Sequence, residues 1–108
     1  MTDYIIVLNK DEDTVSFLDE AAGAVVKTVP VDRNPHEVAV TPDGLKAFVS
    51  NAGADTISVF DMTILDVVDT IKHPEFRFPH EGQVTPDGRL VLASTYGANV
   101  DLRNRWMR

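Results

Sequence analysis

Apolar residues occur along this chain in short runs, and segments rich in Gly, Asn, Asp and Pro separate them. Tyr4 to Leu8, Ala47 to Val49 and Ile57 to Phe60, the last with the small residue Ser58, are three such runs. β-Branched residues, which favour strands, are frequent in them. No apolar stripe with the 3.6-residue period of a helix persists. The pattern therefore predicts an all-β chain of short strands.

The runs belong to a repeated unit. Three blocks of sequence occur twice in the same order: Asp13-Thr14-Val15-Ser16-Phe17-Leu18-Asp19 with Asp55-Thr56-Ile57-Ser58-Val59-Phe60-Asp61, Pro35-His36-Glu37 with Pro79-His80-Glu81, and Thr41-Pro42-Asp43-Gly44 with Thr85-Pro86-Asp87-Gly88. The offset is 42 residues for the first block and 44 for the other two. Two extra residues between Lys72 and Pro79 account for the difference, and a loop accommodates such an insertion at little cost.

Each copy of the unit contains four predicted strands joined by turns. Thr41–Gly44 has Pro and Gly where a type I turn favours them, so it predicts a hairpin. Asn9–Asp13 and Asn51–Asp55 contain residues that tolerate turn dihedrals and form the next connection. After another strand, Val67–Ile71 repeats Val25–Val29 as the fourth.

A repeat of about 40 to 45 residues with four strands is typical of a β-propeller blade. We predict a partial propeller of about two and a half four-stranded antiparallel blades, with strands labelled A to D outward from the axis. The chain begins with strands B, C and D of one blade. A complete A to D blade follows between His36 and His73, and strands A and B of a third blade come last.

Three segments resemble the YVTN-type β-propeller repeat, namely Asn34–Gly44, Phe48–Asn51 and Asp55–Asp61. That family is related to lactonase-like propellers and to propeller domains of surface-layer proteins. The resemblance covers residues 4 to about 99 and implies the propeller fold. Its implication for activity is limited, because the matching residues are mostly turn and packing residues.

The repeat region is predicted to occupy residues 1–100, and residues 101–108 depart from it. A third copy of the Asp-Thr-Ile-Ser-Val-Phe-Asp block is due there, but the sequence instead has three of the ten Lys and Arg residues. We interpret this basic tail as a truncation, a change of frame or a poorly ordered end, with an oligomerisation tag as the alternative.

The chain is too short for a closed ring by itself. Even four blades need roughly 160 to 170 residues, and the chain has 108. The expected partners are therefore other propeller blades, either in a longer protein of which this chain is a fragment or in a ring assembled from copies. Uncapped ends of a partial stack expose apolar sheet faces and strand edges.

Composition narrows the location and partners further. The formal net charge of −7 disfavours nucleic acid. The longest apolar run, Tyr4 to Leu8, is too short to span a membrane, so no membrane association is expected. With no signal peptide and no cysteine, the chain as written is expected in the cytoplasm. An extracytoplasmic location is the alternative if the N-terminus is truncated.

The candidate metal ligands are His36, Glu37, His80 and Glu81, which occupy equivalent positions at the start of neighbouring A strands. Imidazole and carboxylate are ordinary ligands for zinc and similar divalent ions. A metal site at the mouth of the channel is one interpretation. The other is that each His packs between blades and bonds a backbone carbonyl, repeating because the blade repeats.

A candidate ligand-binding segment is Phe76-Arg77-Phe78, in the longer connection that leads to His80. Its aromatic pair could line a pocket for a small molecule, or could cover the edge of a blade.

Two functions therefore stay open. One is a repeat scaffold that binds a protein or a small molecule, and the other is part of a lactonase-like or metal-dependent hydrolase. No residue is assigned a catalytic role, and enzymatic activity is left undecided.

Overall fold

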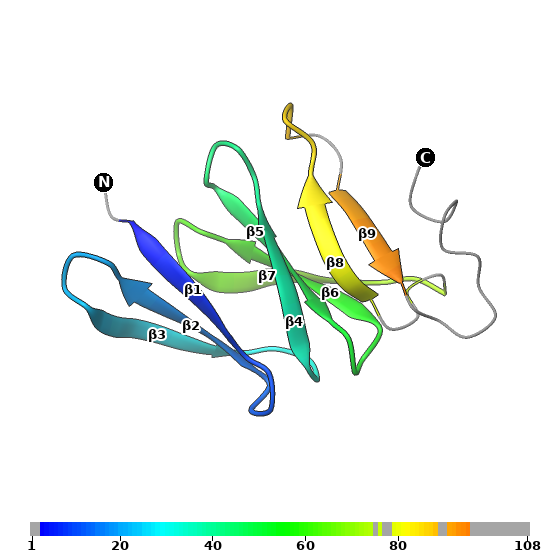
Figure 1. Cartoon of the computed structure of the whole chain (residues 1–108), viewed down its shortest axis with the longest axis horizontal. Coiled ribbons are helices and arrows are strands. Elements are labelled where there is room, and N and C mark those ends of the chain that lie inside the picture. The colour runs from blue at the N-terminus through cyan, green and yellow to red at the C-terminus, as the bar shows by residue number, and fades with distance from the viewer. Residues whose placement is uncertain (1–2, 75, 77–78, 89–90, 96–108) are drawn as a thin grey trace.

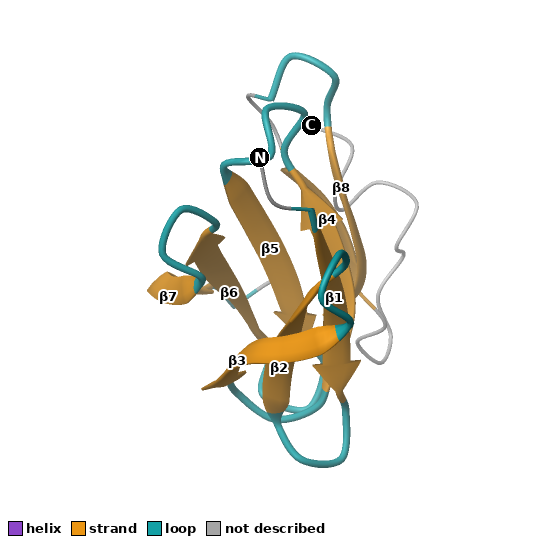
Figure 2. Ribbon diagram, turned by 90° about the vertical axis from the view of Figure 1, so that its left-hand side faces the viewer, coloured by secondary structure: helices purple, strands orange, loops and turns teal. Residues whose placement is uncertain are grey.

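The computed structural model describes residues 3–74, 76, 79–88 and 91–95, which form strands and loops (Figures 1 and 2). The basic tail at 101–108 lies outside these residues. The described strands are, in chain order, β1 (Tyr4–Asn9), β2 (Thr14–Asp19), β3 (Ala24–Pro30), β4 (Pro35–Val40), β5 (Lys46–Asn51), β6 (Thr56–Asp61), β7 (Asp66–Lys72), β8 (Pro79–Val84) and β9 (Val91–Thr95).

These strands form three antiparallel sheets that confirm the predicted division into blades. The first sheet has the order β1-β2-β3, the second β4-β5-β6-β7 and the third β8-β9. The first strands of the second and third sheets, β4 and β8, lie side by side, and β1 approaches β4 (Figure 1). His36 and His80 therefore begin strands of two different, neighbouring sheets, as blades arranged about an axis require.

The first two sheets repeat each other in register. β1 pairs with β2 so that Tyr4 lies opposite Asp19, and β5 pairs with β6 so that Lys46 lies opposite Asp61. Each pair in the second sheet is displaced by the same 42 residues that relate the sequence copies. The next pairing also repeats an irregularity, after Phe17 in β2 and after Val59 in β6. β1 therefore occupies the blade position that β5 occupies in the second sheet.

The Thr-Pro-Asp-Gly turn forms as predicted. The N–H of Gly44 donates to the carbonyl oxygen of Thr41 at 2.8 Å. Gly44 and Gly88 both have φ of 74°, a left-handed conformation in which a side chain is strained. The hydroxyl of Thr41 donates to Asp43 at 2.6 Å, and this bond, with that from the N–H of Leu45, holds the pKa of Asp43 below its ordinary value.

Asp19 and Asp61 stabilise the turn between the two outer strands of each sheet. The carboxylate of Asp19 accepts the N–H groups of Ala21 and Ala22 at 2.9 and 3.2 Å. The carboxylate of Asp61 accepts the hydroxyl and the N–H of Thr63 at 2.6 and 2.8 Å, and these bonds lower the pKa of Asp61. The two residues are therefore turn residues at equivalent places of the repeat.

The main core lies between the first and second sheets. The rings of Phe17 and Phe60 meet edge to face, with centroids 5.5 Å apart and planes at 67°. Both side chains are fully buried. The buried residues of this core come from strands of both sheets and, for Leu65, from the turn between β6 and β7: Val15, Phe17, Val29, Ala47, Val49, Phe60 and Leu65. The two blades therefore stabilise each other by covering facing apolar surfaces.

The segment between β3 and β4 is bonded to turns of both sheets. The carboxylate of Asp13, in the first sheet's turn, accepts the N–H of Asn34 at 2.9 Å. The N–H of Gly53, in the second sheet's turn, donates to the carbonyl of Arg33 at 3.0 Å. A Cβ at Gly53 would lie 3.2 Å from the Cβ atoms of Arg33 and Asn34, so the absence of a side chain permits this close approach.

The described part of the chain contains no helix with the length and apolar character needed to cross a membrane.

Candidate functional site

His36 and Glu37 lie at the start of β4, directly after the fully buried Pro35. The pairing of β4 with β5 is irregular between Pro35 and Glu37, and such irregularities redirect side chains at strand ends. The Nδ1 atom of His36 lies 3.7 Å from a carboxylate oxygen of Glu37. Side-chain exposure is 21% for His36 and 45% for Glu37, but the Nδ1 atom of His36 that faces Glu37 is itself shielded from solvent.

The backbone brings the equivalent residues onto the neighbouring strand. β8 begins with the fully buried Pro79, followed by His80 and Glu81, and its pairing with β9 shows an irregularity in the same place. The side chains of His80 and Glu81 lie outside the described part of the structure. Among the residues whose side chains are described, no three His, Asp or Glu gather as a metal site would need. The four-residue metal site remains a prediction.

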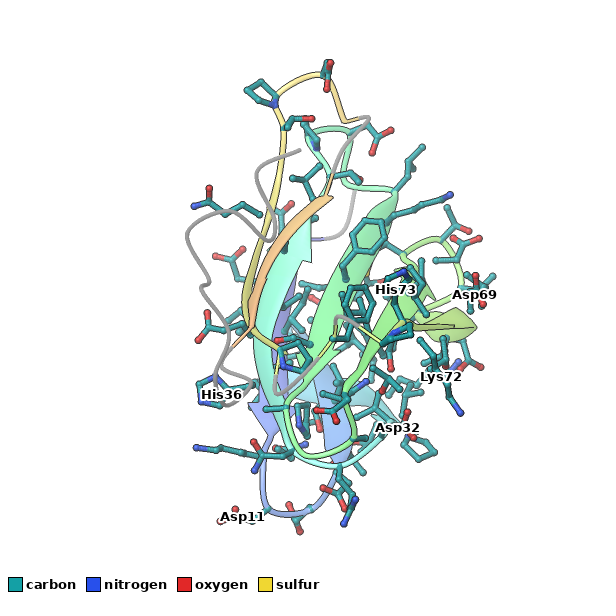
Figure 3. All side chains as sticks on the ribbon, turned by 90° about the vertical axis from the view of Figure 1, so that its right-hand side faces the viewer. Asp11, Asp32, His36, Asp69, Lys72 and His73 are labelled. Carbon is teal, nitrogen blue, oxygen red and sulfur yellow. The ribbon has the colours of Figure 1, made fainter. Side chains whose placement is uncertain are left out.

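The candidate ligand-binding segment is described only at Phe76, since Arg77 and Phe78 lie outside the described residues. Phe76 is half-buried, and its ring centroid lies 5.8 Å from that of His73, with the planes tilted by 49°. The N–H of Phe76 donates to the carbonyl of His73 at 2.9 Å. His73 and His36 lie far apart in Figure 3, so this aromatic pair and the His36–Glu37 pair are separate places on the molecule.

An open depression of about 400 Å³ lies beside the end of β7. Figure 3 shows Asp32, Lys72 and His73 on the same side of the molecule, from the linker before β4 and from the end of β7. The depression is lined by Asp32, Ala54, Asp55, Thr56, Lys72, His73 and Pro74. The mixture of carboxylate, ammonium and imidazole groups suits a small polar molecule rather than an apolar one.

Below the depression lies a hydrogen-bond network that sequence reasoning missed. The hydroxyl of Thr56 donates to Asp32 at 2.6 Å and accepts the amide Nδ2 of Asn51 at 3.2 Å. The same Nδ2 donates to the hydroxyl of Ser58 at 2.9 Å. Asn51 is fully buried, and its amide oxygen accepts no hydrogen bond within the described structure. The network orients Asp32, which comes from the segment between the sheets.

The first sheet contains the same arrangement at a distance of 42 residues. The amide of Asn9 donates to the hydroxyls of Thr14 and Ser16 at 3.0 and 2.9 Å. Ser16 and Ser58 are buried and accept hydrogen bonds in these networks. The signal that could have revealed them is the Asn-x4-Thr-x-Ser spacing, which occurs once in each copy.

The first sheet exposes a face that is covered in the second. Ile5 and Val7 of β1 are 49% and 37% exposed, whereas Ala47 and Val49, their counterparts in β5, are 1% and 0% exposed. The second sheet covers these positions by packing against the first, and the described residues place no sheet over the first. We call this open face the leading face. Its apolar residues are Ile5, Val7, Leu18 and Val25, which the strand pairing places on the same side of the sheet.

Known proteins support the architecture. The chain is similar to Kuenenia stuttgartiensis hydrazine synthase, with 28% identity and a TM-score of 0.84 over 91% of this chain and 27% of that one. It is also similar to a functionally unknown protein from Desulfotomaculum acetoxidans DSM 771, with 21% identity and a TM-score of 0.74 over 85% of this chain and 31% of that one. No curated protein matches.

The chain therefore spans less than a third of either solved chain that it resembles. The sequence pattern of the YNCE-like β-propeller family matches residues 1–107, nearly the full length. Together with the three sheets and their repeated register, this match shows that the chain belongs to the YNCE-like β-propeller family.

Proposed function

We propose that this chain is a propeller module that stacks with further blades and serves as a binding scaffold. The observation that carries the proposal is the difference between equivalent positions, since Val7 is 37% exposed and Val49 is 0% exposed. An apolar surface that a neighbouring blade covers in one copy is open in the other. The larger size of the solved relatives supports the same conclusion.

The leading face predicts concentration-dependent association of the isolated chain. We expect Val7→Lys to weaken this association about tenfold or more, because stacking would bury the new charge without a partner. Sedimentation velocity over a range of protein concentrations measures the effect. Circular dichroism of the same sample checks that the variant remains folded.

Val26→Lys is the matched control. Val26 is 51% exposed in β3, and its counterpart Val68 is 52% exposed in the covered second sheet, so stacking does not bury this position. We expect Val26→Lys to associate like the parent chain. An equal effect of the two lysines, or a parent chain that stays monomeric at every concentration, would contradict the proposed stacking.

The hydrolase interpretation depends on whether the His and Glu side chains of neighbouring blades bind a metal ion together. The pairing of His36 with Glu37 supplies two ligand types, whereas a catalytic zinc needs three protein ligands. As a scaffold, the chain is expected to retain no stoichiometric zinc, calcium or manganese after dialysis. Elemental analysis of the purified protein measures this directly.

Two His variants make the metal test specific. His80→Ala removes a candidate ligand, and His73→Ala removes an exposed imidazole outside the candidate set. If the parent chain holds stoichiometric metal that His80→Ala loses and His73→Ala keeps, the hydrolase interpretation replaces the scaffold proposal. An unchanged, substoichiometric metal content in the parent chain and both variants supports the scaffold.

A further inference from the structure

The depression beside the end of β7 lies where the second copy of the repeat departs from the first. Lys72 ends β7 and His73 begins the next connection, and their counterparts at a distance of 42 residues are Pro30 and Val31. Val31 packs against the core between the blades. The second copy therefore has an ammonium and an imidazole where the first has a proline and a packed valine.

Side chains that fold a blade recur with the blade, as Asn9 and Asn51 do in their hydrogen bonds to Thr and Ser. Lys72 and His73 do not recur, and the first copy forms its sheet without them. The connection that follows them is also two residues longer than its counterpart. A change of residue type and a change of length thus coincide at the depression, in a connecting segment of the kind that carries functional residues.

The negative group that lines the depression with Lys72 is the carboxylate of Asp32. Asp32 is half-buried, and its Oδ2 atom accepts the hydroxyl of Thr56 at 2.6 Å. Thr56 is in turn held by the amide of the fully buried Asn51 at 3.2 Å. The contacts of the described structure use Oδ2 of Asp32 and leave Oδ1 for a ligand. The carboxylate is oriented before a ligand arrives, which lowers the ordering cost of binding.

Asp55 lines the same depression, but the repeat assigns it to a turn. It is displaced by 42 residues from Asp13, whose carboxylate accepts the N–H of Asn34 in the following connection. We therefore give Asp55 no role in binding. The charges left for a ligand are one carboxylate, on Asp32, and one ammonium, on Lys72.

These two charged groups share the depression without pairing with each other. Asp32 and Lys72 lie on the same side of the molecule (Figure 3), and the described structure contains no ion pair between them. The volume of about 400 Å³ accommodates a small molecule. A metal ion fits poorly, because no three His, Asp or Glu gather among the residues whose side chains are described. A molecule with one positive and one negative group matches the lining.

We infer that this depression binds a small zwitterion, a molecule that carries an ammonium and a carboxylate group as free amino acids do. The ammonium donates to Oδ1 of Asp32 and the carboxylate accepts from Lys72, both in charge-assisted hydrogen bonds. His73 lines the site, and its ring contacts that of Phe76 at a centroid distance of 5.8 Å. The inference rests on the proposed binding function, whose ligand class it names, and it requires no further blade.

Titration with 4-aminobutyrate and its two single-charge analogues tests the inference. Butyrate lacks the ammonium and butylammonium lacks the carboxylate, while glycine is a zwitterion with a shorter span. The amide NMR signals of Ala54, Lys72 and His73 report on the depression. The full-length chain used carries Val7→Lys, so that association of copies does not contribute to the signal changes.

We expect at least one of the two zwitterions to shift these signals saturably. Its dissociation constant should be about tenfold lower than that of butyrate and about fivefold lower than that of butylammonium. The loss is smaller for butylammonium because Lys72 is exposed, and an exposed ion pair is weaker than a hydrogen bond to a half-buried carboxylate.

Three variants assign the two charges. Asp32→Asn keeps an oxygen that accepts the hydroxyl of Thr56 but removes the charge, and it should weaken zwitterion binding about tenfold. Lys72→Met keeps the apolar stem and should weaken binding about fivefold. Lys10→Met removes an exposed lysine from the turn after β1, and as the matched control it should leave binding unchanged. The amide spectrum of each variant checks its fold.

Three results would overturn the inference. They are no saturable shift with either zwitterion, a single-charge analogue that binds as tightly as the better zwitterion, or equal losses for Lys72→Met and Lys10→Met. Stacking is measured separately, by sedimentation of the parent chain and its variants at Val7 and Val26. Absence of zwitterion binding with association intact therefore overturns the ligand site alone, and zwitterion binding without association overturns only the stacking.

Discussion

Phe60→Ala is expected to lower the free energy of unfolding by about 4 kcal/mol, because it leaves a large cavity in the core. Phe60 is fully buried and meets Phe17 edge to face at 5.5 Å, so the substitution also removes an aromatic contact between the two blades. A loss of this size is comparable to the whole stability of many small domains. Urea denaturation followed by far-ultraviolet circular dichroism measures it.

The repeat provides a control at the equivalent position of the first blade. Leu18 is displaced from Phe60 by 42 residues, and it lies half-buried on the leading face. Leu18→Ala removes a side chain over which the described residues place no further blade, so its expected cost is about 1 kcal/mol. If the two alanine variants lose equal stability, the core does not lie between the blades as described.

Local patterns made most of this fold predictable. Strand positions follow from short β-branched runs, and the Thr-Pro-Asp-Gly segment predicts its hairpin because Gly44 must adopt positive φ. The division into three sheets follows from the spacing of the repeat. These features depend on residues close together in sequence, and so they can be read from one chain.

The candidate site was less predictable because it depends on distances between separate segments. The sequence shows that His36 and His80 occupy equivalent positions, and the backbone agrees, but spacing alone does not determine whether imidazoles on two strands converge. The hydrogen bond from Thr56 to Asp32 likewise depends on how two separate segments lie in space. It joins residues 24 positions apart, one in a strand and one in the segment between sheets.

The exposure of individual side chains could not be predicted from the sequence pattern either. Val7 and Val49 are the same residue type at the same place in the repeat, yet one is exposed and the other is buried. Their environments differ because one sheet has a neighbour on that face and the other lacks one among the described residues. A repeat therefore predicts local structure better than it predicts burial at the ends of a stack.

Asn51→Ala is expected to cost about 3 kcal/mol, because it deletes two hydrogen bonds at a fully buried position and leaves a small cavity. Asn9→Ala is the matched control. Asn9 donates the same two kinds of hydrogen bond in the first sheet but is only half-buried, so water can replace the amide. Its expected cost is about 1 kcal/mol. Urea denaturation of the two variants gives the comparison.

Asn51→Asp tests the direction of the bonds in this network. The hydroxyl proton of Thr56 is donated to Asp32 at 2.6 Å, so Thr56 presents a lone pair to residue 51. A carboxylate there would face that lone pair without solvent, and both effects raise the pKa of the new Asp in the folded state. A raised folded pKa means that stability is retained below the unfolded pKa and lost as pH rises.

The Asp variant should therefore approach the parent chain in stability near pH 4 and fall several kcal/mol below it near pH 7, since a buried charge without a partner is costly. Asn51→Ala carries no titrating group, so its deficit relative to the parent should stay constant over the same range. Urea midpoints at each pH distinguish the two. A pH-independent deficit for Asn51→Asp would mean that Thr56 can turn its proton toward residue 51, and that Asp32 is held by other contacts than this hydroxyl.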